Sequence, residues 1–157
     1  MLSASEFTVG SIGKAIPLTL VLPRHEGEEA ILIARCSCGP AALFLSENHR
    51  FQWFASAHNE HWHGLLVAGV RIEVDETSIF DPARLHAKLG TVVRQGTQLV
   101  AQAKPASNRS VNGFEPVVLE DGLAATTDEA AGFHRWRIVI GSGRDKRVLH
   151  EVSIAHS

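Results

Sequence analysis

The stretch that decides the expected fold class is Asp81–Lys104, DPARLHAKLGTVVRQGTQLVAQAK. Asp81-Pro82 is a typical helix start, because Asp caps free backbone amides and Pro suits the first helical position. Apolar or small residues then recur at spacings of three and four, which is the pattern of an amphipathic helix. They are Leu85, Leu89, Val92, Val93, Gly96, Leu99, Val100 and Ala103. The pattern predicts one helix over residues 82–104, with Leu85, Leu89, Val92, Leu99 and Ala103 buried.

Two glycines in this stretch leave an alternative open. Gly90 and Gly96 each weaken a helix interior by about 1 kcal/mol relative to Ala. The alternative is a short helix that ends at Leu89, followed by a hairpin that turns at Gln95-Gly96. The long helix is preferred because the periodicity continues across both glycines.

Strand patterns surround this stretch. Residues 66–74 alternate, with Leu66, Ala68, Val70, Ile72 and Val74 on one face and a bulge expected at Gly69. Similar runs occur at 16–22, 30–34, 41–45, 51–57, 116–119, 135–140 and 148–154. The expected fold is α+β: a single domain, residues 1–157, with a bent antiparallel sheet of about seven strands packed on one long helix. Pro, Ser, Asn and Gly in residues 105–114 predict an exposed loop within it.

Composition narrows the class of protein. The chain has 157 residues, 45% of them hydrophobic, and 15 Lys+Arg against 17 Asp+Glu, for a net charge of −2. This is too apolar for a disordered chain, and it lacks the cationic excess of a nucleic-acid binder that acts through bulk charge. Met1–Phe7 shows no export signal and no apolar run approaches a membrane span, so a cytoplasmic protein is expected.

The two cysteines, Cys36 and Cys38, are expected to be reduced. On one extended strand their Cα atoms would lie about 6.6–6.8 Å apart, at the limit of disulfide geometry.

The sharpest chemical cluster is His58-Asn59-Glu60-His61-Trp62-His63. On an extended segment the side chains of His61 and His63 point the same way and can converge on one divalent transition metal, with His58 as the third ligand. The other interpretation is a wet loop between two strands, anchored by Trp62. Cys36 and Cys38 are interpreted as small apolar residues on a buried strand.

Charged residues predict a second surface. Arg144, Lys146 and Arg147 follow a hairpin turn, and Arg135 and Arg137 lie on the adjoining strand. Together they form a basic patch for an anion or an acidic partner. Glu73, Asp75 and Glu76 form an acidic counterpart, which is interpreted as a solvated strand face.

No catalytic or nucleotide-binding motif occurs, so the sequence predicts a soluble binding or assembly module. Self-association is expected, because Phe51, Trp53 and Trp62 are candidates for exposed apolar residues and strands can pair edge to edge between subunits. One alternative is a metal-binding protein or metal-dependent enzyme that uses His58, His61 and His63. Another is a small-ligand binder with its pocket between helix and sheet.

Overall fold

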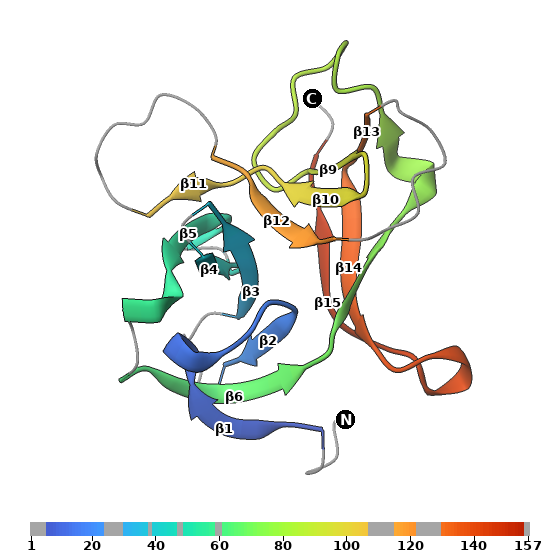
Figure 1. Cartoon of the computed structure of the whole chain (residues 1–157). Coiled ribbons are helices and arrows are strands. Elements are labelled where there is room, and N and C mark those ends of the chain that lie inside the picture. The colour runs from blue at the N-terminus through green and yellow to red at the C-terminus, as the bar shows by residue number, and fades with distance from the viewer. Residues whose placement is uncertain are drawn as a thin grey trace.

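Strands and short turns make up the described part of the chain, which contains no α-helix (Figure 1). The computed structural model describes residues 6–23, 30–37, 39–46, 49–58, 61–106, 115–121 and 130–155. The expected α+β fold with one long helix is therefore wrong. The same finding removes the expected ligand pocket between helix and sheet.

The strands form two sheets. The large sheet contains β1 (Thr8–Ser11), β2 (Thr19–Leu22), β3 (Ile31–Cys36), β4 (Gly39–Phe44), β5 (Gln52–Ala55), β6 (His63–Ala68), β8 (Ile79–Phe80), β9 (Val92–Gln95), β10 (Gln98–Ala101), β11 (Lys104–Pro105), β12 (Val117–Glu120) and β13 (Ala131–Phe133). The small sheet contains β7 (Arg71–Val74), β14 (Arg135–Ile140) and β15 (Arg147–Ser153), in the order β15-β14-β7. All pairings are antiparallel except that of β11 with β5.

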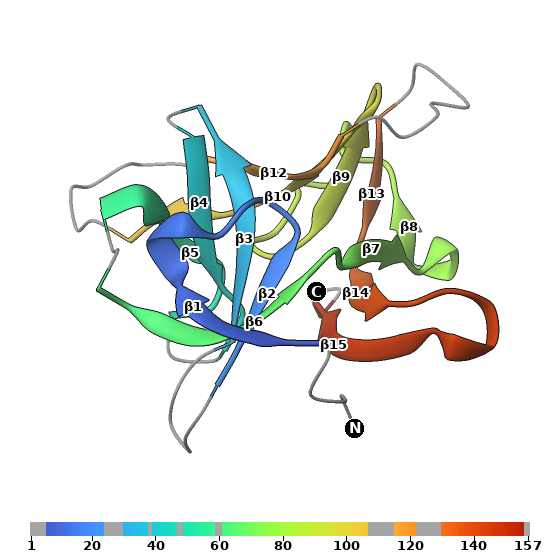
Figure 2. The ribbon, with the colours of Figure 1, turned by 60° about the horizontal axis from the view of Figure 1, so that its bottom comes forward.

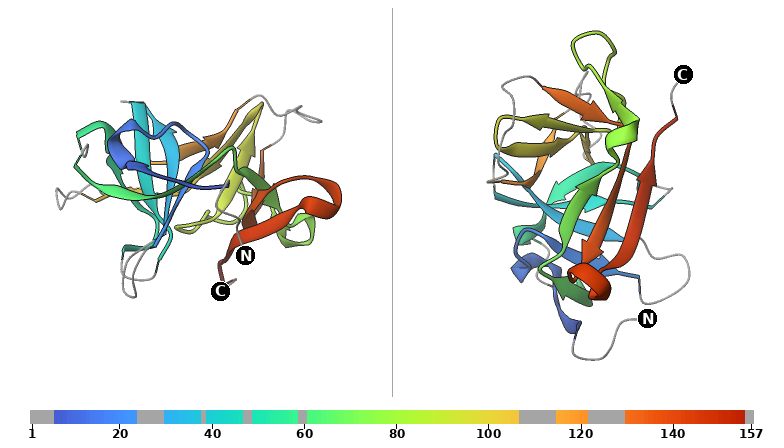
Figure 3. Two further views of the ribbon diagram at one scale, coloured as in Figure 1. Left: turned by 90° about the horizontal axis from the view of Figure 1, so that it is seen from below. Right: turned by 90° about the vertical axis from the view of Figure 1, so that its right-hand side faces the viewer.

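Three chain segments pass from one sheet into the other. β6 leads through Gly69 and Val70 directly into β7, β7 leads through the turn η4 (Glu76–Ser78) into β8, and β13 leads through His134 into β14. Figure 2 shows the first of these segments running from the side of the large sheet to the small one. The small sheet is therefore continuous in backbone with the large sheet at three places in the described part of the chain, and its β14–β15 hairpin extends to one side (Figure 3).

The main core lies where the two sheets face each other. Its members include Leu20, Leu32, Val67, Leu99, Leu119, Trp136, Ile138 and Val152. Trp136 is 2% exposed, and its indole Nε1–H donates to the carbonyl oxygen of Gly90 at 2.8 Å. Burial of these side chains is the main stabilising contribution to the fold.

A smaller apolar cluster covers the other face of β2, β3 and β4. Its members are Ile12, Ala15, Val21, Ile31, Ile33 and Ala42, and Phe44, Phe54 and Leu66 pack against them. Ile12 belongs to the helical turn η1 (Ile12–Lys14), which follows β1. The segment from Ile12 to Ala15 thus packs over this face of the sheet.

The expected helix fails at its two glycines. Asp81 does cap a turn, accepting a hydrogen bond from the Ala83 amide at 2.9 Å, but that turn is not continued. Gly90 has φ +89° and Gly96 has φ +56°, left-handed values that do not occur inside an α-helix. The hairpin between β9 and β10 turns next to Gly96, with Gln95 opposite Gln98, so the hairpin of the alternative is confirmed and its short helix is not.

Burial in this stretch follows strands rather than a helix face. Val92, Leu99 and Ala103 are buried as expected, but Leu85 is 56% exposed and Leu89 is only partly buried. The apolar positions were largely right, but they do not share one helical stripe. Spacings of three and four also arise when two short strands are joined by a turn.

The aromatic residues expected at the surface are distributed differently. Phe51 is 2% exposed, and Trp53 is half-buried with its Nε1–H donating to the Glu115 carbonyl at 3.1 Å. Only Trp62 of the three is largely exposed, at 42%. Of the three side chains on which the expectation of self-association depends, two are therefore not largely exposed.

Several predicted strands are confirmed, including those near residues 16–22, 30–34 and 41–45 and the C-terminal hairpin. Of the expected loop 105–114, Pro105 lies in β11 and residues 107–114 lie outside the described residues.

Cys36 is disulfide-bonded, contrary to the expectation of a reduced thiol, and Cys38 lies outside the described residues. The distance estimate assumed one extended strand, whereas the chain reverses after Cys36 to pair it with Gly39. None of the described helical turns has the length and apolar character needed to cross a lipid bilayer.

Candidate binding surface on the small sheet

Alternation along three strands separates charged from apolar side chains on the small sheet. Val74, Trp136 and Val152 lie opposite one another and belong to or pack against the core. The neighbouring row is Glu73, Arg137 and Glu151, which points to the other face. Successive strand residues point to opposite faces, so the outer face of this sheet collects the charges.

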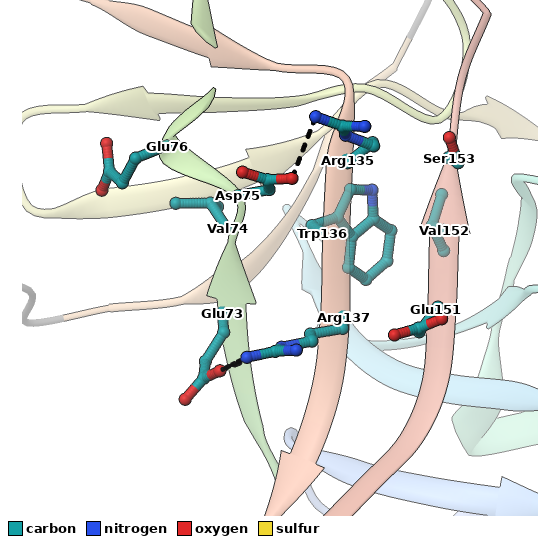
Figure 4. A pocket seen from close by; sticks show the side chains of 10 residues that line it. All are labelled: Glu73, Val74, Asp75, Glu76, Arg135, Trp136, Arg137, Glu151, Val152 and Ser153. Carbon is teal, nitrogen blue, oxygen red and sulfur yellow. Dashed lines mark hydrogen bonds and ion pairs between the residues drawn. The ribbon is translucent and has the colours of Figure 1, made fainter. Parts of the chain in front are cut away.

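A groove of about 430 Å³ lies on this outer face (Figure 4). We call it the charged groove. Its lining residues are Glu73, Val74, Asp75, Glu76, Arg135, Trp136, Arg137, Glu151, Val152 and Ser153. All come from β7, β14 and β15 or from the start of the turn after β7, so the sheet register fixes the positions of the charges.

Glu73 is the centre of one ion-pair group. Arg137 donates from Nε and Nη2 to the same carboxylate oxygen, Oε1, at 3.0 and 2.9 Å. Lys146 Nζ reaches Oε1 at 3.2 Å and Oε2 at 3.1 Å. Burial acts to raise the pKa of Glu73, but the bonds and charges of Lys146 and Arg137 outweigh it, so the pKa lies below its ordinary value.

Asp75 is held in a second group. Its Oδ1 accepts from the Thr77 hydroxyl at 2.6 Å and from the Thr77 amide at 2.9 Å, while Arg135 Nη2 lies 3.1 Å from Oδ2. These Thr77 hydrogen bonds, and after them the charge of Arg135, lower the pKa of Asp75. Both carboxylates are therefore ionised near neutral pH, which suits ion pairing rather than proton transfer.

The structure brings together most of the predicted basic patch, but each of those cations already has an acidic partner. Arg135 bonds Asp75, Arg137 and Lys146 bond Glu73, and Arg147 bonds Glu6. Arg144, on the exposed turn η5 (Gly143–Asp145), has no ion pair among the described residues. The acidic face expected to be solvated is thus the partner of the basic patch, which leaves little free positive charge for an anion.

Glu151 is the carboxylate of the charged groove that has no ion-pair partner among the described residues. It lies opposite Arg137 on β15, but Arg137 turns toward Glu73 (Figure 4). Within the described part of the chain no ion pair to Glu151 is found. Sequence reasoning missed both Glu151 and Ser153, although their alternation with Val152 and His150 placed them on the solvent face.

The structure does not test the complete predicted histidine cluster, because the side chain of His58 lies outside the described residues. Among the described residues, no three His, Cys, Asp or Glu side chains lie close enough to hold a metal ion. His61 and His63 are both exposed, and the His63 ring nitrogen Nδ1 lies 3.0 Å from the His61 carbonyl oxygen. His61 lies in a turn and His63 begins β6, so these two histidines do not lie on one extended strand.

Comparison with known proteins establishes the family. The family model with the description "Uncharacterised protein y4lG" matches residues 9–157. The chain belongs to the y4lG family. A curated relative, "Uncharacterized protein y4lG" of Sinorhizobium fredii (strain NBRC 101917 / NGR234), is 47% identical over 153 residues, which cover 98% of this chain and 94% of the relative. No solved structure matches the chain. The y4lG match includes every residue of the charged groove and, apart from Thr8, every strand residue of both sheets.

Proposed function

We propose that this protein is an assembly module in which a second copy of the chain pairs with the free edge of β15. The observation that carries the proposal is the position of β15. This seven-residue strand pairs with β14 on one side, and no described strand pairs with it on the other. An unpaired edge presents backbone donors and acceptors that another strand can bond.

The direction of the backbone groups along β15 follows from one hydrogen bond. The Ile154 amide donates to the His134 carbonyl at 2.9 Å, so the backbone groups of Ile154 point toward the strand that contains β14. In an antiparallel ladder, residues alternate between bonding the neighbour and facing away from it. Val152 and His150 therefore bond β14, and the amide and carbonyl groups of Glu151 and Ser153 point to the free side.

Side-chain chemistry favours one register for a second copy. Pairing centred on Glu151 would place two like charges directly opposite, which is unfavourable. Antiparallel pairing centred on Val152 places Ser153 opposite the partner's Glu151, and both residues have outward backbone groups. The serine hydroxyl then donates to a carboxylate that lacks an ion pair among the described residues of its own chain. The two small sheets would form one six-stranded sheet, with the charged grooves side by side.

Three substitutions at position 153 test this register by light scattering and analytical ultracentrifugation. Ser153→Pro removes the outward amide but no bond to β14, and we expect it to abolish the dimer. Ser153→Glu faces the partner's Glu151 and should weaken the dimer about tenfold or more, whereas Ser153→Lys should retain or strengthen it. Ser153→Ala, which keeps the amide, is the control for the proline variant.

The charge variants also control for damage to the fold. Within one chain, residue 153 lies opposite Arg135. A glutamate there is attracted to Arg135 and a lysine is repelled, so the monomer stabilities should rank opposite to the dimer affinities. A monomeric wild-type protein at high micromolar concentration would overturn the proposal, as would a proline variant that dimerises as well as Ser153→Ala.

A further inference from the structure

We infer that the outer face of the large sheet carries a second site, which binds a flat, uncharged aromatic molecule through stacking and one hydrogen bond. The site is a groove of about 410 Å³. We call it the aromatic groove, and it is lined by Ile12, Val21, Leu22, Ile31, Phe44, Trp62, His63 and Gly64. Small-molecule sites occupy about 300–1,000 Å³, so the groove suits a compact ligand.

Aliphatic side chains form one side of the aromatic groove. Val21 and Leu22 come from β2, Ile31 comes from β3, and Ile12 comes from the turn η1. Val21, Ile31 and Ile12 belong to the smaller apolar cluster and are buried, so their positions are fixed by packing against the sheet. A ligand that contacts them displaces water from apolar surface, which is favourable.

Aromatic rings form the other side. Phe44 and Phe54 have ring centroids 5.4 Å apart, and Phe54 meets Trp62 edge-on at 5.5 Å. The Trp62 carbonyl accepts a hydrogen bond from the Ile12 amide at 2.8 Å, which fixes the backbone of this residue beside the groove. The indole of Trp62 contacts the Phe54 ring, but the residue is still 42% exposed. Positioned but uncovered indole surface is well suited to stack on another aromatic ring.

His63 supplies the polar contact. Its Nδ1 lies 3.0 Å from the His61 carbonyl oxygen, which can only accept, so Nδ1 carries the proton in this bond. In the neutral ring the other nitrogen, Nε2, is then an acceptor. The imidazole thus offers an acceptor to a ligand hydroxyl or N–H.

The composition of the lining sets the ligand class. Among the described residues, the eight that line the groove include no Lys, Arg, Asp or Glu, so a charged ligand would lose hydration without gaining an ionic partner from them. Sugars also stack on indoles, but each of their hydroxyls needs a polar partner, and the described lining offers two polar side-chain groups, the His63 imidazole and the Trp62 indole N–H. A phenol-like molecule, with one donor on an apolar ring, fits both constraints.

Isothermal titration calorimetry with three naphthalene probes tests the inference. The probes are 1-naphthol, which has a donor, 1-methoxynaphthalene, which lacks it, and 1-naphthoate, which is charged. We expect saturable binding of 1-naphthol, weaker binding of the ether and the weakest binding of the carboxylate. Trp62→Ala should lower the 1-naphthol affinity about tenfold.

Variants at two histidines separate the hydrogen bond from packing. His63→Phe should reduce the affinity for 1-naphthol about fivefold and leave 1-methoxynaphthalene binding unchanged. His61→Phe is the matched control, because His61 is exposed on the same segment but does not line the groove, and it should bind as the wild type does. Absence of saturable 1-naphthol binding, equal affinity in Trp62→Ala, or preference for 1-naphthoate would each overturn the inference.

Discussion

Arg137 and Glu73 lie directly opposite each other on β14 and β7, and the arginine donates two hydrogen bonds to a single carboxylate oxygen. Lys146 joins them from the turn that links β14 to β15. The pair connects an edge strand of the small sheet to its central strand and forms one wall of the charged groove. The coupling free energy of the Arg137–Glu73 pair therefore indicates how firmly this wall of the charged groove is held.

We expect a double-mutant cycle of Glu73→Gln and Arg137→Met to give a coupling free energy of about 1 kcal/mol at neutral pH, the upper end for partly exposed pairs. The pKa of Glu73 is lowered in the folded state, so its stabilising contribution is complete above the ordinary value of 4.5 and is lost as pH falls through the folded value. Urea unfolding at pH 7 and pH 3 measures both. A coupling that is equal at the two pH values would contradict this assignment.

Gly90→Ala should destabilise the protein far more than Gly96→Ala does. Both glycines have positive φ, which costs a non-glycine residue about 1–2 kcal/mol. A Cβ at position 90 would lie 2.1 Å from the Phe51 ring, whereas at position 96 nothing lies within 4 Å. Overpacking adds about 1–3 kcal/mol at position 90 alone. Denaturant unfolding of the two variants isolates that contact, and equal destabilisation would show that Phe51 can move aside.

His150 should make the fold less stable in mild acid. Burial, and then the charge of Arg50, lower the pKa of His150 below 6.5, although Glu151 partly opposes this. The unfolded chain therefore takes up this proton at a higher pH than the folded chain, so stability declines as pH falls from 6.5 toward the folded value. His150→Gln should flatten this part of the curve of melting temperature against pH. His86→Gln, at an exposed position, is the control for the loss of one histidine side chain.

Glu120→Gln should raise the melting temperature at neutral pH. Burial raises the pKa of Glu120, against the opposing effects of the Ile72 amide, which bonds the carboxylate, and of Arg71. A raised pKa means that the ionised form is disfavoured in the fold, so stability is lost as pH rises through the folded value. The gain from glutamine should therefore be near zero at pH 4 and grow toward pH 7. The exposed Glu115→Gln serves as the comparison, and a gain that does not vary with pH would argue against a charge effect.

The sequence predicted the strands with clear alternation, because a period of two is a local property that survives packing. The segment 135–140 is an example, whereas the strand predicted over 66–74 is divided at Gly69 and Val70 into β6 and β7, which belong to different sheets. The helix prediction for residues 82–104 is wrong because it treats the two glycines only as weak helix residues. Position 90 needs a glycine because a Cβ there would collide with the Phe51 ring. That contact joins residues 39 positions apart (90 − 51), so no local pattern reports it.

The two candidate surfaces could be predicted only in part, because they too depend on contacts between residues far apart in the sequence. Both the acidic strand and the basic strand were identified, but their mutual neutralisation depends on the register of β7 against β14, which pairs Glu73 with Arg137. The aromatic groove combines Ile12, Phe44 and Trp62 from three separate segments. The order of the strands in the sheet decides which distant residues lie side by side, and that order is set by the packing of the whole chain.

The three segments that join the sheets, β6–β7, β7–β8 and β13–β14, have a mechanical consequence. A force applied to β15 by a bound partner passes through β14 and β7, and from there along covalent backbone into the large sheet at three points. We therefore expect the amide protons of β7 and β14 to exchange with solvent in one cooperative step with those of β6 and β13, so that the small sheet resists load as part of the whole molecule.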